Sequence, residues 1–293
     1  MKYFLIQIEE NLVEKPWAGD TLSKLKGVVG EIGESWEISP HPKRPSLVEY
    51  EGKIVKMSDV FEEVSAGYKP LLVKFIDAGE KLSVQVHPSD EDAEKLGEED
   101  RGKEEAWITL NKAELMVGFK KQVEREEFLK AVEELRVEEL LNKVECEKYE
   151  GYHIPPKTVH AICRGLIYEI STCSDITYRV YDYGRGRELH LEKALEVIDF
   201  NQCNPSELKF DPKKDSLKGE NFEIRMLRLF RSFTREIENK GYCYVSCVEG
   251  FAELSAYGER VKLNPFKSAF VTCNTDSFML SGSGAVIVAK PRS

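Results

Sequence analysis

The sequence has no long apolar run, and its hydrophobic segments are far shorter than the roughly 20 residues that a membrane-spanning helix needs. It also has no excess of positive charge, because 42 Lys and Arg residues oppose 52 Asp and Glu residues and give a formal net charge of −10. Nucleic-acid binding depends on a clustered positive surface. We therefore expect neither a membrane partner nor a nucleic-acid partner.

Paired cysteines and a secretory leader are missing as well. The seven cysteines are scattered along the chain and lack the close paired spacing of a structural zinc knuckle. The opening residues, MKYFLIQIEE, contain an apolar run too short for a signal peptide, and acidic residues follow it instead of a small-residue cleavage site. These features predict a cytoplasmic protein with reduced thiols.

The chain is rich in short β-like segments. Runs of β-branched and aromatic residues alternate with Gly, Pro, Asn and Asp, a pattern typical of an all-β sandwich or barrel. Helical periodicity is confined to residues 124–144, residues 190–199 and the segment after Ser89, whose hydroxyl precedes an acidic turn as an N-cap would. We therefore expect an all-β dominated fold with a few inserted helices.

The character of the sequence changes after Phe200. A polar stretch with few apolar residues in register follows, and short strand-like runs with Gly-rich turns resume near residue 222. We expect a domain over residues 1–200 with a helical insertion near 124–144, a connecting segment over 201–221, and a smaller β domain over 222–293.

Residues able to bind a metal occur on three predicted strands. Apolar and polar residues alternate in GEKLSVQVHP, so Gln85 and His87 point to the same side. Glu105 shares a strand face with Trp107, and His160 lies on a third strand in PPKTVHAI. A barrel keeps its ligand site in the interior. Two imidazoles, one carboxylate and one amide oxygen form a donor set that suits zinc.

One position in this set has a competitor, because Glu104 stands directly before Glu105. Only Glu105 shares its strand face with Trp107, and this alternation favours Glu105 as the ligand. A shifted strand register would reverse the choice. Whether Glu104 also contributes to the metal site stays open from the sequence.

The motifs resemble those of the type I phosphomannose isomerases of the cupin superfamily, in their short bacterial and archaeal form. The spacing G-x5-Q-x-H, at Gly79, Gln85 and His87, is similar to the first cupin motif with Gln in place of the leading His. Further matching segments follow the order of that family over roughly residues 14–200: KPWAG at 15–19, GESWEISPHP at 33–42, PLLVKFIDA at 70–78, QVHPSD at 85–90, GKEEAW at 102–107, HIPPKTVHAI at 153–162 and SDITYRVYDYGR at 174–185.

The resemblance implies cupin-like jelly-roll barrels and one Zn²⁺ per chain. It implies reversible aldose–ketose isomerisation of mannose 6-phosphate and fructose 6-phosphate, small sugar phosphates, through a zinc-stabilised enediolate. It matches Arg179 to a catalytic arginine and Lys103 to a lysine that handles the substrate, so both are expected to bind substrate. The C-terminal unit resembles a degenerate cupin domain without metal. The implied zinc ligands are Gln85, His87, Glu105 and His160.

Some residues depart from the family pattern or have two readings. The glycine of the motif P-x-G-x-x-H is replaced by Lys157, so the turn before His160 is expected to differ. Trp17 and Trp36 could stack on a sugar or belong to the packed interior, and both readings stay open. We expect the remaining histidines, His41, His153 and His190, to be structural.

Two other functions are compatible with such a site. The first is a non-catalytic, metal-containing cupin that binds sugars, although Arg179 and Lys103 speak against it. The second is a metal-dependent oxygenase on the same barrel, which needs a redox metal and commonly has more imidazoles. The amide of Gln85 disfavours this alternative. The sequence determines neither the oligomeric state nor the base that moves the proton.

Overall fold

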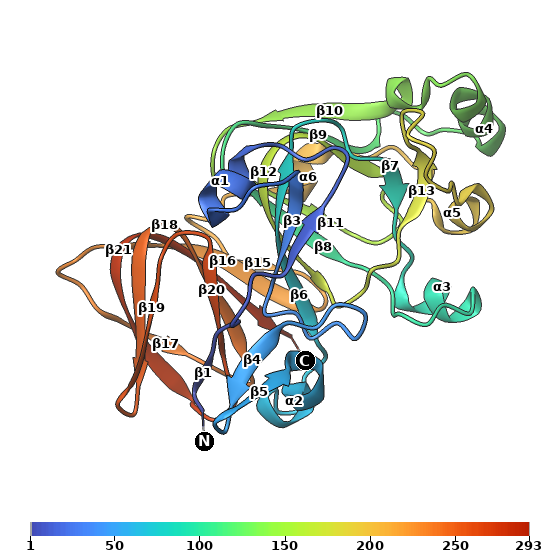
Figure 1. Ribbon diagram of the computed structural model, residues 1–293. Coiled ribbons are helices and arrows are strands. Elements are labelled where there is room, and N and C mark those ends of the chain that lie inside the picture. The colour runs from blue at the N-terminus through green and yellow to red at the C-terminus, as the bar shows by residue number, and fades with distance from the viewer. Residues whose placement is uncertain (1, 293) are drawn as a thin grey trace.

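The computed structural model describes residues 2–292 as two large, largely antiparallel sheets with helices at their periphery (Figure 1). The prediction of an all-β dominated fold is confirmed. The eleven-stranded sheet contains β2 (Leu12–Glu14), β3 (Ile32–Glu37), β6 (Leu71–Ala78), β7 (Val84–Val86), β8 (Glu105–Thr109), β9 (Ala113–Phe119), β10 (Leu141–Cys146), β11 (Gly151–Ile154), β12 (His160–Thr172), β13 (Tyr178–Tyr181) and β14 (Lys209–Phe210).

The second sheet has eight strands and lies to the left in Figure 1, mostly in orange and red. A separate hairpin of β4 (Leu47–Tyr50) and β5 (Lys53–Lys56) lies near its lower edge. The strands of the eight-stranded sheet are β1 (Phe4–Leu5), β15 (Leu217–Lys218), β16 (Phe222–Leu229), β17 (Arg235–Glu238), β18 (Cys243–Ala256), β19 (Glu259–Leu263), β20 (Lys267–Val271) and β21 (Ser277–Pro291).

The long strand β12 belongs to both layers of the eleven-stranded sheet. Residues 160–164 pair with β9, and His160 also pairs with β7, whereas residues 165–172 pair with β6 and β8. Between these two parts Gly165 has a φ of 124°, and a Cβ there would lie 2.6 Å from the Cβ of Ala113. Only glycine fits this bend without strain. The bend lets one strand contribute side chains to two walls of the same barrel.

The two sheets share a continuous apolar core. Phe75 and Tyr168 from the eleven-stranded sheet belong to the same buried cluster as Tyr244, Phe270 and Ile287 from the eight-stranded sheet. The ring of Phe75 packs edge-on against Tyr168, with 5.6 Å between the ring centroids. Burial of this size fixes two sheets against each other, because separating them would expose the whole cluster to water.

The division into domains stays a prediction, and the strand pairing differs from it at two points. Phe4 and Leu5 pair with Val271 and Phe270, so the N-terminal strand lies in the C-terminal sheet. Both side chains of β1 are buried, and this burial stabilises the position of β1 beside β20. Within the connecting segment 201–221, β14 pairs with β11 of the other sheet.

The helices are α1 (Thr21–Lys26), α2 (Met57–Val64), α3 (Asp90–Lys95), α4 (Arg125–Glu133), α5 (Leu191–Val197) and α6 (Pro205–Leu208), with a 3-10 helix η1 (Val137–Leu140). The helices expected after Ser89 and within 190–199 are confirmed as α3 and α5. Within residues 2–292 no helix is both long and apolar enough to span a bilayer.

The expected helix over residues 124–144 is wrong beyond its first half. The α-helix ends at Glu133, and Leu135 adopts a left-handed φ of 57°. After η1 the chain becomes β10, which pairs with β9 along its length. Hydrogen bonding to β9 stabilises this segment as a strand more than its intrinsic helix propensity stabilises a helix, because tertiary contacts commonly override propensity.

The start of α3 gives a test of local stability. The Ser89 hydroxyl accepts a hydrogen bond of 3.1 Å from the Asp92 amide, and Asp92 Oδ2 accepts a reciprocal one of 3.3 Å from the Ser89 amide. We expect Ser89→Ala to lower the free energy of unfolding in urea by about 1 kcal/mol. The control Ser206→Ala, at an exposed helical serine, should change it by less than about 0.5 kcal/mol. Equal effects would contradict the capping role.

Candidate active site

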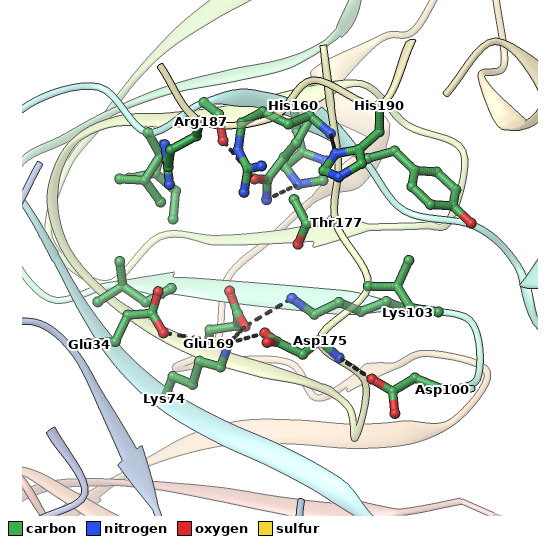
Figure 2. A pocket seen from close by; sticks show the side chains of 18 of the residues that line it. Glu34, Lys74, Asp100, Lys103, His160, Glu169, Asp175, Thr177, Arg187 and His190 are labelled. Atoms are coloured by element: carbon green, nitrogen blue, oxygen red, sulfur yellow. Dashed lines mark hydrogen bonds and ion pairs between the residues drawn. The ribbon is translucent and has the colours of Figure 1, made fainter. Parts of the chain in front are cut away.

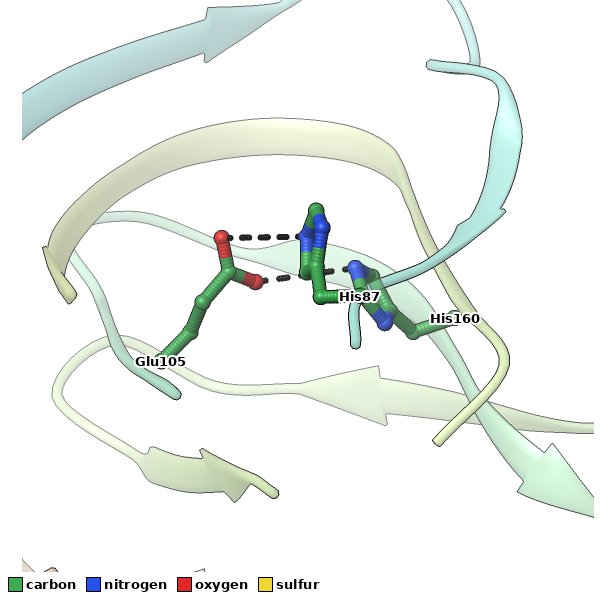
Figure 3. Close-up of side chains that lie close together, drawn as sticks. All are labelled: His87, Glu105 and His160. Atoms are coloured by element: carbon green, nitrogen blue, oxygen red, sulfur yellow. Dashed lines mark ion pairs between the residues drawn. The ribbon is translucent and has the colours of Figure 1, made fainter. Parts of the chain in front are cut away.

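Three ionisable side chains converge inside the barrel: His87 after β7, Glu105 at the start of β8 and His160 at the start of β12 (Figure 3). The Nε2 atom of His87 lies 3.4 Å from Glu105 Oε1, and that of His160 lies 3.5 Å from Glu105 Oε2. Each side chain is only 1% exposed. The carboxylate thus faces one imidazole with each oxygen, as Figure 3 shows.

The two imidazoles are oriented as metal ligands are. His87 Nδ1 donates to the carbonyl of Ile176 over 2.7 Å, and His160 Nδ1 donates to the carbonyl of Thr158 over 2.8 Å. A carbonyl can only accept, so each Nδ1 carries the proton and each Nε2 keeps a lone pair directed at the cluster. Burial lowers the pKa of His87, and it lowers that of His160 to about 3, which keeps both rings neutral.

Strand register places Gln85 between two other expected site residues. Gln85 on β7 is paired with His160 on β12 at one side and with Arg179 on β13 at the other, so all three point to the same face. The Gln85 amide nitrogen lies 3.3 Å from His160 Nε2 and 3.5 Å from His87 Nε2. Rotation of the amide by 180° places its oxygen at this position, as a fourth oxygen or nitrogen donor.

The carboxylate of Glu105 is ionised although it is buried. Burial raises its pKa, but the adjacent Lys103 ammonium holds that pKa well below its usual range. The Lys103 ammonium contacts Glu105 Oε1 and lies 3.5 Å from Glu169 Oε1. Within the described residues neither Glu105 oxygen has a hydrogen bond of good geometry. Two such acceptors beside two imidazole lone pairs fit a divalent cation, which would complete their coordination.

The competing acid, Glu104, points to the opposite side of the strand. Its carboxylate accepts hydrogen bonds of 2.8 Å from His153 Nε2 and from the backbone amides of Glu220 and Asn221. Burial raises its pKa, but these bonds lower the pKa to about 2. Glu104 therefore lies outside the His87–Glu105–His160 cluster, and His153 is its partner.

The turn before His160 keeps a glycine-like backbone without a glycine. Lys157 has a left-handed φ of 72°. Its amide donates to the carbonyl of His87 over 2.8 Å, and its ammonium lies 2.9 Å from Asp92 Oδ2. These contacts offset the strain of a side chain in this conformation. The different turn expected from the missing glycine is therefore not seen in the backbone dihedral.

The cluster borders a cavity of about 510 Å³. Figure 2 shows two walls, with Arg187, His160 and His190 on one side and Glu34, Lys74, Glu169 and Lys103 on the other. Trp17 is among the lining residues, whereas Trp36 is not. The lining also includes Lys15, Lys43, Ile76, Leu82, Ser83, Gln85, Glu98, Asp100, Trp107, Ile162, Asp175, Thr177, Tyr178, Arg179 and Lys193.

A buried charge network under the cavity was missed by the sequence reasoning. Lys74 lies 3.8 Å from Glu34, 3.9 Å from Glu169 and 4.0 Å from Asp175, and its ammonium is 4.3 Å from the ring centre of Trp36. Cross-strand pairing places Trp36 on β3, Lys74 on β6 and Glu169 on β12 in one row. A lysine inside the apolar run PLLVKFIDA was the available signal, since a charge is expensive there unless it is paired.

Two family models match the chain. The model of the phosphomannose isomerase type I catalytic domain matches residues 27–122, and that of the mannose-6-phosphate isomerase cupin domain matches residues 214–291. GmuF of Bacillus subtilis, assigned as a mannose-6-phosphate isomerase, is 35% identical over 65% of this chain and 67% of its own length. The chain belongs to the type I mannose-6-phosphate isomerase family.

Other mannose-6-phosphate isomerases are also similar to this chain in sequence or in structure. ManA of Bacillus subtilis is 34% identical, but the matched region spans 64% of this chain and only 65% of ManA. A protein of Archaeoglobus fulgidus, assigned as a mannosephosphate isomerase, has a structure with a TM-score of 0.90 at 31% identity, covering 100% of this chain and 99% of its own. A zinc-bound mannose 6-phosphate isomerase shares the fold at 18% identity, with a TM-score of 0.80 and full coverage of both chains.

The Lys74 network gives a stability test. We expect Lys74→Met to lower the free energy of unfolding in urea by about 2 kcal/mol, because it removes one cation from two buried acids, Glu34 and Glu169. Each acid keeps a second cation, Lys15 beside Glu34 and Lys103 beside Glu169. The matched control is Lys209→Met, which removes an exposed lysine 2.7 Å from Glu150 and should cost less than about 1 kcal/mol. If both variants lose a similar free energy of unfolding, the buried network does not contribute more to stability than an exposed ion pair does.

Proposed function

We propose that this protein interconverts mannose 6-phosphate and fructose 6-phosphate. The observation that carries the proposal is the convergence of two neutral imidazoles and an ionised carboxylate beside a cavity that also contains Lys103 and Arg179. Membership of the family supports the same substrate class. The cavity, at about 510 Å³, has the size of a site for a small molecule such as a hexose phosphate.

The proposed metal is a single Zn²⁺ ion per chain, held by Gln85, His87, Glu105 and His160. Imidazole nitrogen and carboxylate oxygen are common zinc donors, and the carbonyl-bound Nδ1 atoms hold both rings in the ligating tautomer. One carboxylate leaves the centre with a formal charge of +1. Bound there, the ion supplies a Lewis acid that favours negative charge on nearby substrate oxygens.

The reaction moves a proton between two neighbouring carbons while a carbonyl and a hydroxyl exchange places. The activation barrier is high because negative charge develops on the two substrate oxygens as the enediolate forms. Arg179 suits the stabilisation of that charge, because its guanidinium lines the cavity beside Gln85 and its Nε atom is buried without a partner in residues 2–292. Its remaining contact is a 2.9 Å hydrogen bond from Nη1 to the carbonyl of Glu188.

Lys103 is the second residue proposed to act on the substrate. Burial lowers its pKa, but Glu105 and Glu169 raise the pKa above its ordinary value, so the ammonium form persists. A permanently charged ammonium can donate to a sugar oxygen or stabilise its negative charge, and it is a poor base at neutral pH. The proposal therefore gives Lys103 a binding and electrostatic role.

Of the two tryptophans considered as sugar contacts, only Trp17 is favoured. Trp17 lines the cavity, while Trp36 lies behind Lys74 and donates from Nε1 to Glu34 Oε2 over 2.8 Å. Trp36 therefore supports the charge network. A stacked sugar is proposed for Trp17 alone.

A coupled assay with mannose 6-phosphate tests the function. Zinc-loaded protein should turn over the substrate, a chelator should abolish turnover, and added Zn²⁺ should restore it, because the proposed Lewis acid is removable. Metal analysis before and after each step should give about one zinc per chain when the protein is active. Absence of turnover by the zinc-loaded protein would refute the proposed function.

The variant His87→Ala tests the ligand assignment. It should lose metal and activity together, with activity falling at least 100-fold, since an imidazole ligand and its bond to the Ile176 carbonyl are both removed. His190→Ala, at a histidine that lines the cavity away from the cluster, should keep its metal. Full metal content in His87→Ala, with circular dichroism confirming the fold, would rule out His87 as a ligand.

A further inference from the structure

Glu104 joins the C-terminal sheet to the segment that carries Lys103 and Glu105. Its carboxylate is 3% exposed and accepts four hydrogen bonds of 2.8 Å, two on each oxygen. Three of the four donors belong to Glu220 and Asn221, which form the turn between β15 and β16 and lie 116 and 117 residues further along the chain. A carboxylate with this number of donors is held in one position.

The turn is shaped to receive this carboxylate. A Cβ on Gly219 would lie 2.4 Å from Glu104 Oε1, so a side chain there would push the turn away. On its other side the turn is fixed by the C-terminal end of the chain, since the Arg292 amide donates to the Asn221 carbonyl over 2.8 Å. The side chain of Asn221 also accepts from Arg101 Nη2 over 2.7 Å. The turn is therefore a rigid contact for Glu104.

The position of this contact matters because the β-ladder ends there. Glu105 is the first residue of β8 and pairs with Ile154 of β11, and Lys103 and Glu104 precede the strand. The Lys103 amide donates to the Pro88 carbonyl over 3.0 Å, and the Thr172 amide donates to the Glu104 carbonyl over 3.0 Å. The Thr172 hydroxyl accepts from the Glu104 amide over 3.2 Å and donates to the Gly102 carbonyl over 2.7 Å. These bonds hold the backbone within the eleven-stranded sheet, and the side chain of Glu104 adds a contact from the eight-stranded sheet.

We propose that Glu104 is a positioning residue, through which the turn at residues 219–221 sets the direction of Lys103 and Glu105 in the active site. Side chains alternate along an extended chain, so anchoring the middle one fixes the two on the other face. The C-terminal sheet then contributes to the reaction without placing a residue in the cavity. This inference rests on the proposed function for its kinetic consequences only.

The test uses Glu104→Gln and Gly219→Ala in the full chain loaded with Co²⁺ or Zn²⁺. Glu104→Gln keeps the shape of the side chain, but its amide NH2 group then faces N–H donors of Glu220 or Asn221 and cannot accept from them. Gly219→Ala places a Cβ against the Glu104 carboxylate and displaces the turn. In both variants we expect the Kd for Co²⁺, measured by competition with a chelator, to rise about 10-fold with an altered visible spectrum. We expect kcat to fall about 10-fold with KM nearly unchanged.

The matched control is Glu249→Gln. Glu249 on β18 accepts from the hydroxyl of Tyr149, in the loop before β11, over 2.7 Å, but it lies outside the cavity lining and the metal cluster. This variant should lower the thermal midpoint while leaving the Co²⁺ Kd and kcat within about twofold of the parent. If Glu104→Gln and Gly219→Ala behave like the control in Kd and kcat, Glu104 is only structural and the proposal is wrong.

The two hypotheses fail in different ways. Absence of turnover by the zinc-loaded parent refutes the proposed function, and the Co²⁺ Kd and spectrum still test the positioning role of Glu104. An active parent whose Glu104→Gln and Gly219→Ala variants keep normal Kd, spectrum and kcat refutes the positioning role alone.

Discussion

The burial of one ionised carboxylate, that of Glu105, is the constraint on which the site depends. Such a charge is costly in a closed barrel unless cations or strong donors surround it. The structure supplies the Lys103 ammonium, yet neither carboxylate oxygen obtains a hydrogen bond of good geometry in the described residues, and the facing nitrogens of His87 and His160 carry lone pairs. This incomplete solvation, together with the two imidazole lone pairs, explains why the cluster suits a divalent cation.

The architecture brings these groups together by bending one strand. Because β12 belongs to both layers, His160 lies with β7 and Gln85 on one wall, while Glu169 lies with Lys74 on the other. The candidate ligands Gln85, His87 and His160 belong to the first wall, whereas Glu105 on β8 belongs to the second wall, together with the charge network. The packed core shared by both sheets fixes the barrel to the C-terminal unit. The C-terminal unit also contacts the barrel at Glu104, which accepts from the Glu220 amide.

Local patterns predicted some elements well and others poorly. The capped helix after Ser89 and the amphipathic helix α5 follow from short-range chemistry, and the structure has both. The segment 124–144 failed because its second half pairs with β9, and no local signal in a charged, helix-favouring sequence indicates that partner. In the same way, the N-terminal strand β1 gives no sign in the sequence that it joins the C-terminal sheet.

The sequence by itself determined which residues can share a strand face, since a period of two is a local property: Gln85 with His87, and Glu105 with Trp107. The resemblance to known isomerases added the expected substrate and the expected roles of Lys103 and Arg179. Only the tertiary structure decided that Glu104 faces a turn more than 100 residues away, and that Lys74 neutralises acids on two other strands. These contacts depend on register and sheet packing, which join segments that no local pattern relates.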